Sequence, residues 1–134
     1  MAKSIVVIFA LIDQNKILIE RRPIKGFLDP RILIPGGSVN SLENLEDALK
    51  REMMEELGII PTTFELLTNE DIEGLHNNIL KPFIVNSWQG EIPKIGMDKE
   101  DPFPLEWLEI DQVLNVQIKP TKKIVEEVKK YLSR

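Results

Sequence analysis

Three glutamates, Glu52, Glu55 and Glu56, crowd into the stretch 52–56 of the sequence. In a helix, positions i, i+3 and i+4 lie on neighbouring parts of the surface, so these carboxylates would gather on one side. The pair Glu52 and Glu56, at i and i+4, would then cost about 0.2–0.5 kcal/mol through repulsion of like charges. A bound divalent cation would offset that repulsion. Oxygen ligands without histidine or cysteine favour Mg²⁺, or Mn²⁺ as a substitute, over Zn²⁺.

The position of the glutamates on the helix sharpens this hypothesis. The same helix carries an apolar stripe of Leu45, Leu49, Met53 and Leu57. On a wheel of about 100° per residue, Glu52 and Glu56 overlap the edge of this buried stripe. Arg51 is expected to pair with Glu55 and to point away from the other two glutamates. A solvated acidic face without a metal is the alternative reading of this pattern, and the wheel does not decide between them.

Local signals define the helix that must position these residues. Asn44 is a suitable N-cap, Asp47 lies in the first turn, and Gly58 follows the last apolar residue. An asparagine before a helix and a glycine after it satisfy the unpaired backbone groups at the two ends. The sequence therefore predicts a helix over 45–57.

The rest of the chain alternates short apolar strands with turn residues. Residues 5–12 and 16–20 predict a hairpin around the polar turn 13–15, and 31–34 predicts a strand that ends in a tight turn at Gly36–Gly37. Further strands are predicted over 62–67, 79–88 and 105–109, with loops over 21–29 and 90–104. Pro82 indicates an edge strand or a bulge within 79–88.

The C-terminal part of the sequence has helical patterns. Asp111 is expected to cap a single helical turn, and 121–132 predicts an amphipathic helix with Ile124, Val125, Val128 and Leu132 on one stripe. Strands mixed with two substantial helices, without regular βαβ alternation, predict an α+β fold with a mixed β-sheet packed between helices. At 134 residues, the chain fits a single domain over 1–134.

Composition restricts the classes of partner. With 43% hydrophobic residues, 29% charged residues and a net charge of −5, the chain has the composition of a globular protein and lacks the basic face that a nucleic-acid polymer requires. It has no cysteine, which excludes disulfides and thiol catalysis. The apolar run 5–12 is too short to cross a membrane and lacks a signal-peptide cleavage site. We therefore expect a cytoplasmic protein without a membrane partner.

The whole stretch 37–59 resembles the Nudix box, GX5EX7REUXEEXGU, in which U is a bulky aliphatic residue. Every fixed position is filled at the correct spacing, by Gly37, Glu43, Arg51, Glu52, Glu55, Glu56 and Gly58. The flanks 17–23, 88–91 and 105–108 resemble the MutT-like branch of this family. The resemblance implies a Nudix-type α/β/α sandwich, which agrees with the order of elements predicted above.

The resemblance also implies a function and a set of site residues. It implies a Mg²⁺-dependent pyrophosphohydrolase that cleaves a nucleoside triphosphate, or another nucleoside diphosphate linked to X, through attack of water at phosphorus. By position, Glu52, Glu55, Glu56 and the carbonyl of Gly37 would bind the metal, and Glu52 would orient or deprotonate the water. Arg51 and Glu43 would pair and hold the loop against the helix. A small-molecule nucleotide is thus the expected partner.

Other residues enter this reading as weaker candidates. Asp98, Glu100 and Asp101 follow the box where relatives recruit a further metal-binding carboxylate, and Arg22, Arg21 and Lys81 are candidates for phosphate contacts. His76 is expected to be a loop or strand residue, and Trp88 and Trp107 to be partly buried sheet residues. Two departures from the MutT-like pattern are Leu42 in place of a glycine and a segment 117–123 without the asparagine that reads oxidised guanine.

Two hypotheses of different classes remain open. The first is the hydrolase, and the second is a non-hydrolysing module on a Nudix fold that binds a nucleotide or a protein partner. The complete set of glutamates favours the hydrolase. The sequence leaves the base, the leaving group and the choice between monomer and homodimer open.

Overall fold

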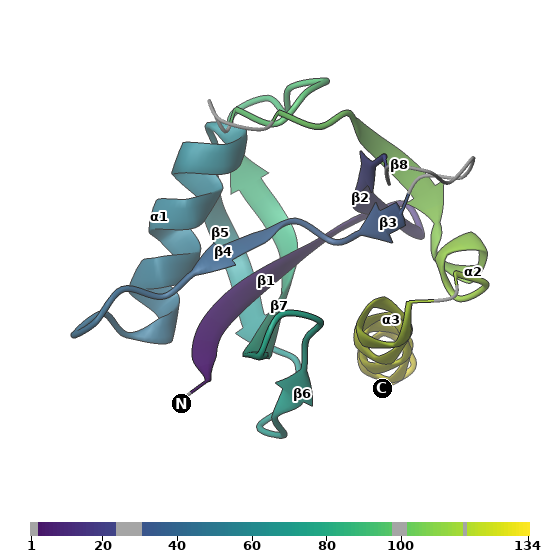
Figure 1. The fold of residues 1–134 in the computed structure, drawn as a ribbon. Helices are drawn as coiled ribbons and strands as arrows, with labels where there is room; N and C mark the ends of the chain where they lie inside the picture. The colour runs from purple at the N-terminus through teal and green to yellow at the C-terminus, as the bar shows by residue number, and fades with distance from the viewer. Residues whose placement is uncertain (1–2, 24–30, 98–101, 117) are drawn as a thin grey trace.

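The computed structural model describes residues 3–23, 31–97, 102–116 and 118–134. Asp98, Glu100, Asp101 and most of the predicted loop 21–29 therefore lie outside the described residues. In chain order the elements are β1 (Ser4–Asp13), β2 (Lys16–Arg22), β3 (Arg31–Leu33), β4 (Gly36–Ser38), α1 (Leu45–Leu57), β5 (Ile60–Leu66), β6 (Ile72–Glu73), β7 (Asn78–Gln89), β8 (Leu105–Glu109), α2 (Ile110–Val113) and α3 (Lys119–Leu132) (Figure 1).

Within the described residues, eight strands form one mixed sheet in the order β3-β2-β1-β7-β5, with β4 added to β1, β6 to β7 and β8 to β2. β1 and β7 run parallel, with Ser4 opposite Asn78 and Leu11 opposite Val85, whereas β1 pairs with β2 and β4 in antiparallel fashion. Figure 1 shows α1 on one side of the sheet and α3 on the other. The predicted α+β fold, with a mixed sheet between helices, is confirmed.

β1 supplies both faces of the core, because its successive side chains point to opposite sides of the sheet. One cluster lies under α1 and includes Val7, Phe9, Leu11, Leu49, Met53 and Leu57. The other lies under α3 and includes Ile8, Ala10, Ile12, Ile124, Val125 and Val128. A strand buried on both faces has a continuous apolar sequence, which explains the run at 5–12.

The predicted bounds of α1 are confirmed, together with both caps. The Asn44 side chain accepts a hydrogen bond of 2.8 Å from the Asp47 N–H, and Gly58 has a left-handed φ of 67° and donates its N–H to the Met54 carbonyl at 3.0 Å. These contacts satisfy backbone groups at each end of the helix. The capping residues fix where α1 begins and ends, and thus which residues face the sheet.

The predicted turn at Gly36–Gly37 is wrong. These residues form β4, which pairs in antiparallel fashion with β1, placing Gly36 opposite Ile8 and Gly37 opposite Val7. A Cβ atom at residue 36 would lie 2.4 Å from the Val7 carbonyl oxygen. The glycines therefore serve close packing within the sheet rather than a change of chain direction.

Pro82 does not lie on an edge strand, since β7 pairs with β1 on one side and with β5 and β6 on the other. The Pro82 carbonyl accepts the Leu67 N–H at 2.8 Å, just beyond the end of β5. N–H and C=O groups of one strand residue point to the same side, so the missing donor of Pro82 faces the break between β5 and β6. That break, and the two-residue strand β6, had no local signal in the sequence.

The C-terminal elements differ from prediction in detail. The N-cap of α2 is Glu109 rather than Asp111, which lies in the first turn, and α3 begins two residues earlier than predicted, at Lys119. Ile124, Val125 and Val128 are buried as predicted, but Leu132, in the last turn, is exposed. In the described part of the chain, no helix combines the length and apolar character needed to cross a bilayer.

Candidate active site

The three glutamates of α1 differ in burial. Glu52 has only 7% of its surface exposed and lies next to the fully buried Met53. Glu56 is partly buried, and Glu55 is exposed. Glu52 thus borders the apolar stripe as the wheel predicted, and its charge must be compensated by neighbouring groups.

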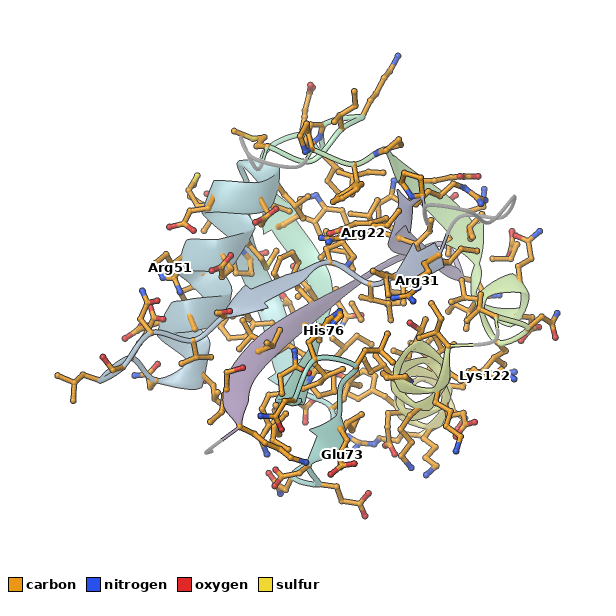
Figure 2. The ribbon with its side chains drawn as sticks, viewed as in Figure 1. Arg22, Arg31, Arg51, Glu73, His76 and Lys122 are labelled. Carbon is orange, nitrogen blue, oxygen red and sulfur yellow. The ribbon has the colours of Figure 1, made fainter. Side chains whose placement is uncertain are left out.

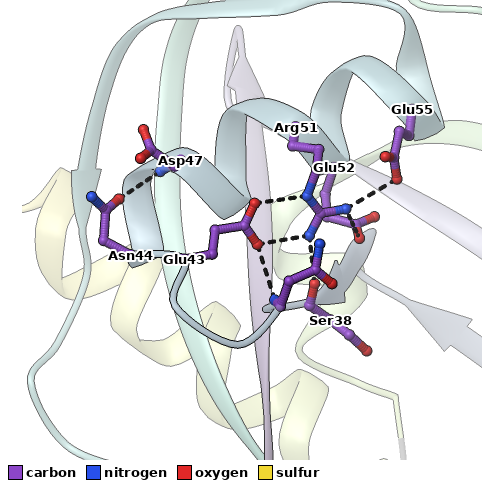
Figure 3. Close-up of polar contacts among 8 residues, drawn as sticks. Ser38, Glu43, Asn44, Asp47, Arg51, Glu52 and Glu55 are labelled. Carbon is purple, nitrogen blue, oxygen red and sulfur yellow. Dashed lines mark hydrogen bonds and ion pairs between the residues drawn. The ribbon is translucent and has the colours of Figure 1, made fainter.

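Arg51 organises the acidic groups around it (Figure 3). Its Nε and Nη2 atoms donate to the two carboxylate oxygens of Glu43 at 2.8 and 2.9 Å, and Nη2 also donates to the Ser38 carbonyl at 2.8 Å. Its Nη1 atom donates to Glu52 Oε1 at 2.8 Å and to Glu55 Oε2 at 3.1 Å. One guanidinium therefore joins the loop before α1, the end of β4 and two carboxylates of the helix.

The expectation that Arg51 points away from Glu52 is wrong. A wheel gives the direction of the Cα–Cβ bond, but the long arginine side chain bends back across the helix surface. The predicted pairings of Arg51 with Glu55 and with Glu43 are both present. Because the guanidinium presents several N–H groups in a planar fork, one arginine can serve all these acceptors.

The charges of this network shift the pKa values of its members. Hydrogen bonds from Arg51 and from the Asn40 N–H lower the pKa of Glu43 to about 2. The same pairing raises the pKa of Arg51. Burial raises the pKa of Glu52 above its usual value, against the opposing hydrogen bond from Arg51. Pairing with Arg51 therefore decides the direction of the pKa shift at Glu43, whereas at Glu52 the effect of burial on the pKa outweighs that pairing.

Gly37 provides the space that the Glu52 carboxylate occupies. A Cβ atom at residue 37 would lie 2.0 Å from Glu52 Oε2 and 2.6 Å from its Cγ. Any larger residue would displace the carboxylate. The backbone of β4 and the Glu52 side chain are thus in direct contact, which places the Gly37 backbone beside a buried carboxylate.

The oxygen-rich composition of this site fits a hard divalent cation such as Mg²⁺. Across the described residues, no three acidic or histidine side chains are grouped closely enough to hold a metal ion as they stand. Glu52 and Glu55 nevertheless both contact a single atom, Arg51 Nη1, at 2.8 and 3.1 Å. One cation can therefore contact both carboxylates, and the exposed Glu55 side chain is free to change its rotamer.

A cavity of about 220 Å³ lies on the other face of β4. Its apolar lining belongs to the core cluster under α3 and includes Val6, Ile8, Ile34, Leu80 and Ile124. Its polar lining consists of Glu20, Arg22, Arg31, His76, Asn78 and Thr121. An apolar hollow with a few polar groups is the usual form of a small-molecule site.

Only one of the three predicted phosphate-binding cations lines this cavity. Arg22 does so, pairs with Glu20 at 2.9 Å, and lies 4.1 Å above the ring of Phe103. Arg21 instead pairs with Glu106 on β8. Lys81 pairs with Asp71 at 2.6 Å and is not among the lining residues.

Sequence reasoning missed Arg31, Asn78 and Thr121 as cavity residues, and it expected His76 to be only a loop or strand residue. Figure 2 labels Arg31 and His76. Arg31 lies directly opposite Arg22 in the β2–β3 pair, so a correct pairing of these strands would have found it. Asn78 shares its face of β7 with Leu80, and only alternation along this strand could have indicated it. Trp88 and Trp107 are partly buried and stacked on one another at 6.0 Å, as expected for sheet residues.

The two glycines of β4 connect the cavity with the acidic site. Gly36 lines the cavity, whereas Gly37 contacts Glu52. Consecutive residues of a strand point to opposite faces, so a single backbone separates the cavity from the buried carboxylate. A ligand that fills the cavity and extends past β4 would reach the carboxylates.

Comparison with known proteins decides the family. A family model described as the NUDIX domain matches residues 1–131. The chain belongs to the Nudix family. The stretch 37–59, in which the sequence resembles the Nudix box, lies within the matched residues of this Nudix protein.

Two curated relatives of this Nudix protein are named 8-oxo-dGTP diphosphatase. The protein from Escherichia coli (strain K12) is 34% identical over 80 residues, which cover 59% of this chain and 62% of that protein. The protein from Proteus vulgaris is 35% identical over 80 residues, covering 58% of this chain and 70% of the relative. The similarity thus spans less than two thirds of the length of the Escherichia coli relative.

Solved structures agree with this assignment at the level of the fold. The solution structure of the E. coli ORF135 protein has a TM-score of 0.77 at 24% identity and covers 99% of this chain and 93% of its own. The crystal structure of a MutT NUDIX hydrolase from Burkholderia pseudomallei has a TM-score of 0.78 at 24% identity and covers 96% of this chain and 99% of its own. At these identities, the likeness shows a shared Nudix fold.

Proposed function

We propose that this Nudix protein is a Mg²⁺-dependent pyrophosphohydrolase, with Mn²⁺ as a possible substitute. Its substrate is a nucleoside triphosphate, or another nucleoside diphosphate linked to X, and water attacks at phosphorus. The observation that carries this proposal is the buried Glu52 carboxylate, held against Gly37 by Arg51 and separated by one strand from a cavity of about 220 Å³. The curated names of the relatives support a nucleoside triphosphate as the substrate.

Different residues of the chain would have different roles in this reaction. Glu52, Glu55, Glu56 and the Gly37 carbonyl would hold Mg²⁺, which neutralises phosphate oxygens and makes water more acidic. Glu52 is buried and lies against the Gly37 backbone, where its carboxylate would orient the attacking water or accept a proton from it. Arg51 fixes the position of Glu52 through their 2.8 Å hydrogen bond. Asp98, Glu100 and Asp101, which lie outside the described residues, stay candidates for a further metal ligand.

Arg22 and Arg31 supply positive charge at the cavity wall. They lie opposite one another on β2 and β3, and guanidinium groups bind phosphate oxygens through paired N–H donors. The aliphatic lining of the cavity suits a nucleobase, which is flat and largely apolar on its faces. We therefore assign the base to the aliphatic part of the cavity. The phosphates would extend from Arg22 and Arg31 past β4 to the face on which Glu52 lies. Arg21 and Lys81 remain weaker candidates for contacts with the outer phosphates.

The experiment that tests this function is a hydrolysis assay. Phosphate release, after coupling to a pyrophosphatase or a phosphatase, is measured on canonical and oxidised nucleoside triphosphates, nucleotide sugars and dinucleoside polyphosphates, with and without Mg²⁺. We expect metal-dependent turnover of one substrate class. Glu52→Gln and Glu56→Gln should each lower it by roughly 100-fold or more, because each removes a charged oxygen ligand.

Glu46→Gln is the matched control, because Glu46 is an exposed residue in the first turn of the same helix. Its turnover should stay close to that of the wild type. Silence of the folded wild-type protein on the whole panel would contradict the hydrolase. Binding of nucleotides without turnover would then support the non-hydrolysing module. A cytoplasmic location and a monomeric or homodimeric state stay predictions from the sequence.

A second, activity-independent test concerns the metal. Mg²⁺ that binds only the folded protein raises the free energy of unfolding by about 2.7 kcal/mol at a concentration 100 times its Kd. The melting temperature rises as a result. The shift should be present without nucleotide and should be reduced in Glu52→Gln. An unchanged melting temperature of the wild type at millimolar Mg²⁺ would contradict the proposed metal site.

A further inference from the structure

Asn78 stands out among the cavity residues, because its side chain is incompletely satisfied. Within the described part of the chain, Asn78 Oδ1 is the buried side-chain atom that has no hydrogen-bond partner. Buried polar atoms are nearly always paired, and an unpaired one is costly. An exception in the wall of a cavity therefore suggests that a ligand supplies the missing partner.

The surroundings of Asn78 reserve space for its carboxamide. A Cβ atom at Gly74 would lie 1.9 Å from Asn78 Oδ1 and 2.9 Å from its Cγ. The Gly74 N–H also donates to the Asn78 backbone carbonyl at 2.9 Å, which fixes the two residues across the β6–β7 turn. The turn is thus built around the asparagine side chain, and both residues line the cavity.

The charge around the cavity decides which part of a nucleotide meets Asn78. Arg22 and Arg31 lie on β2 and β3, while Asn78 lies at the start of β7 beside aliphatic Leu80. A carboxamide is uncharged and carries an acceptor and two donors on one planar group. It therefore suits an uncharged base edge, on which a donor and an acceptor lie side by side, rather than a phosphate.

We propose that Asn78 is a specificity-determining residue that reads the base through its side-chain carboxamide, in a space kept open by Gly74. This inference rests on the proposed function, since it assigns a role within the same nucleotide site. Rotation about the terminal torsion of asparagine, which is soft, turns the carboxamide toward the cavity. The ligand then supplies the hydrogen bond that Oδ1 lacks in the free protein.

The test compares Asn78→Leu and Asn78→Asp with the wild type. Leucine keeps the branched shape without hydrogen bonding, and aspartate keeps the shape with acceptors only. The kcat/KM is measured with Mg²⁺ on dGTP, 8-oxo-dGTP, dATP, dCTP and dTTP. The Kd of the matching nucleoside monophosphates is measured by calorimetry without metal, which gives a readout independent of catalysis.

We expect Asn78→Leu to lower kcat/KM for the triphosphate of the preferred base by roughly 10-fold to 100-fold, because one bidentate hydrogen-bonding contact is lost. The kcat/KM for the other triphosphates should change little. The Kd of the preferred monophosphate should rise by a similar factor. Asn78→Asp should change the ranking of the bases. The melting temperature of free Asn78→Leu should be unchanged or higher, because the unpaired buried atom is gone.

Two further variants complete the design. Gly74→Ala should reproduce the loss of base preference, because the added methyl group displaces the Asn78 carboxamide. Asn86→Leu is the matched control, since Asn86 is an exposed asparagine near the other end of β7. It should leave the ranking of the bases unchanged.

An unchanged ranking and unchanged monophosphate Kd values in folded Asn78→Leu would overturn the role of Asn78, while hydrolysis by the same protein would leave the proposed function in place. Failure of the folded wild type to hydrolyse any compound of the whole panel, including nucleotide sugars and dinucleoside polyphosphates, would overturn the proposed function. In that case the calorimetry still tests whether Asn78 reads the base. An equal Kd of the monophosphates for wild type and Asn78→Leu, or no binding by either protein, also overturns the inference.

Discussion

Gly37 and Glu52, which belong to different elements and lie far apart in the sequence, are in direct contact. A Cβ atom at residue 37 would lie 2.0 Å from Glu52 Oε2. Strand β4 and helix α1 therefore meet at a point where only a hydrogen atom fits. The proposed catalytic carboxylate owes its position as much to this glycine as to the helix that carries it.

Gly37→Ala should consequently lower turnover by roughly 10-fold or more, because the methyl group displaces the Glu52 carboxylate and geometry at the reacting centre is lost. Hydrolysis of the preferred triphosphate is the measurement, together with a thermal melt. Gly96→Ala is the control, because the nearest atom to a Cβ at residue 96 is 3.8 Å away, an ordinary contact. Equal activities of the two variants would contradict a role for Gly37 in placing Glu52.

The Glu43–Arg51 pair predicts a pH dependence of stability. Its pairing lowers the pKa of Glu43 to about 2, so the ionised carboxylate stabilises the fold above the usual carboxyl pKa of about 4.5. This contribution is lost as the pH falls from about 4.5 toward about 2. A double-mutant cycle of Glu43→Gln and Arg51→Gln, measured by denaturant unfolding, should give a favourable coupling at pH 7 that shrinks at pH 3 and below. A coupling independent of pH would contradict an ionic pair.

Replacement of Leu42 by glycine should stabilise the protein. Leu42 is fully exposed and has a left-handed φ of 68°, a conformation that costs an ordinary residue about 1–2 kcal/mol. Leu42→Gly should raise the free energy of unfolding by about 0.5–1 kcal/mol, after allowance for the greater freedom of glycine in the unfolded chain. Leu42→Ala retains the strain and should change stability little. Destabilisation by glycine would show that the leucine side chain makes a contribution of its own.

Arg22 and Arg21 form a natural pair of variants, because they are neighbours in sequence with different surroundings. Arg22 lines the cavity, whereas Arg21 pairs with Glu106. Arg22→Ala should raise KM by roughly 10-fold, since one charged hydrogen-bonding contact to the substrate is worth about 1.5–3 kcal/mol. Arg21→Ala should have a much smaller effect on KM. The reverse order would place the phosphates nearer to β8 than proposed.

The features that the sequence predicted well depend on neighbours along the chain. The bounds of α1 follow from Asn44 and Gly58, which act within a few residues, and the spacing of the glutamates follows from helix geometry. The hairpin of β1 and β2 follows from the polar turn, where Gln14 and Asn15 have φ of 50° and 63°. The roles that the resemblance to the Nudix box implies for these residues stay predictions.

The features that were missed depend on pairing between distant segments. Gly36 and Gly37 resemble a turn until β1 is placed beside them. Pro82 indicates an edge or a bulge until the break between β5 and β6 is known. The direction of the Arg51 side chain depends on acceptors from the preceding loop and from β4. These acceptors come together only in the folded protein, so helical periodicity did not indicate them.

The parallel pairing of β1 with β7 has a consequence for the order in which the molecule assembles. Asn78 lies opposite Ser4, so the cavity wall forms only when the two ends of a long chain segment have met. Closing a long loop has an entropic cost that slows such contacts, whereas the capped helix α1 depends on local interactions. Helical signal should therefore return early during refolding. The proposed binding of a nucleotide should be among the last properties to return, which would make ligand binding a sensitive reporter of complete folding.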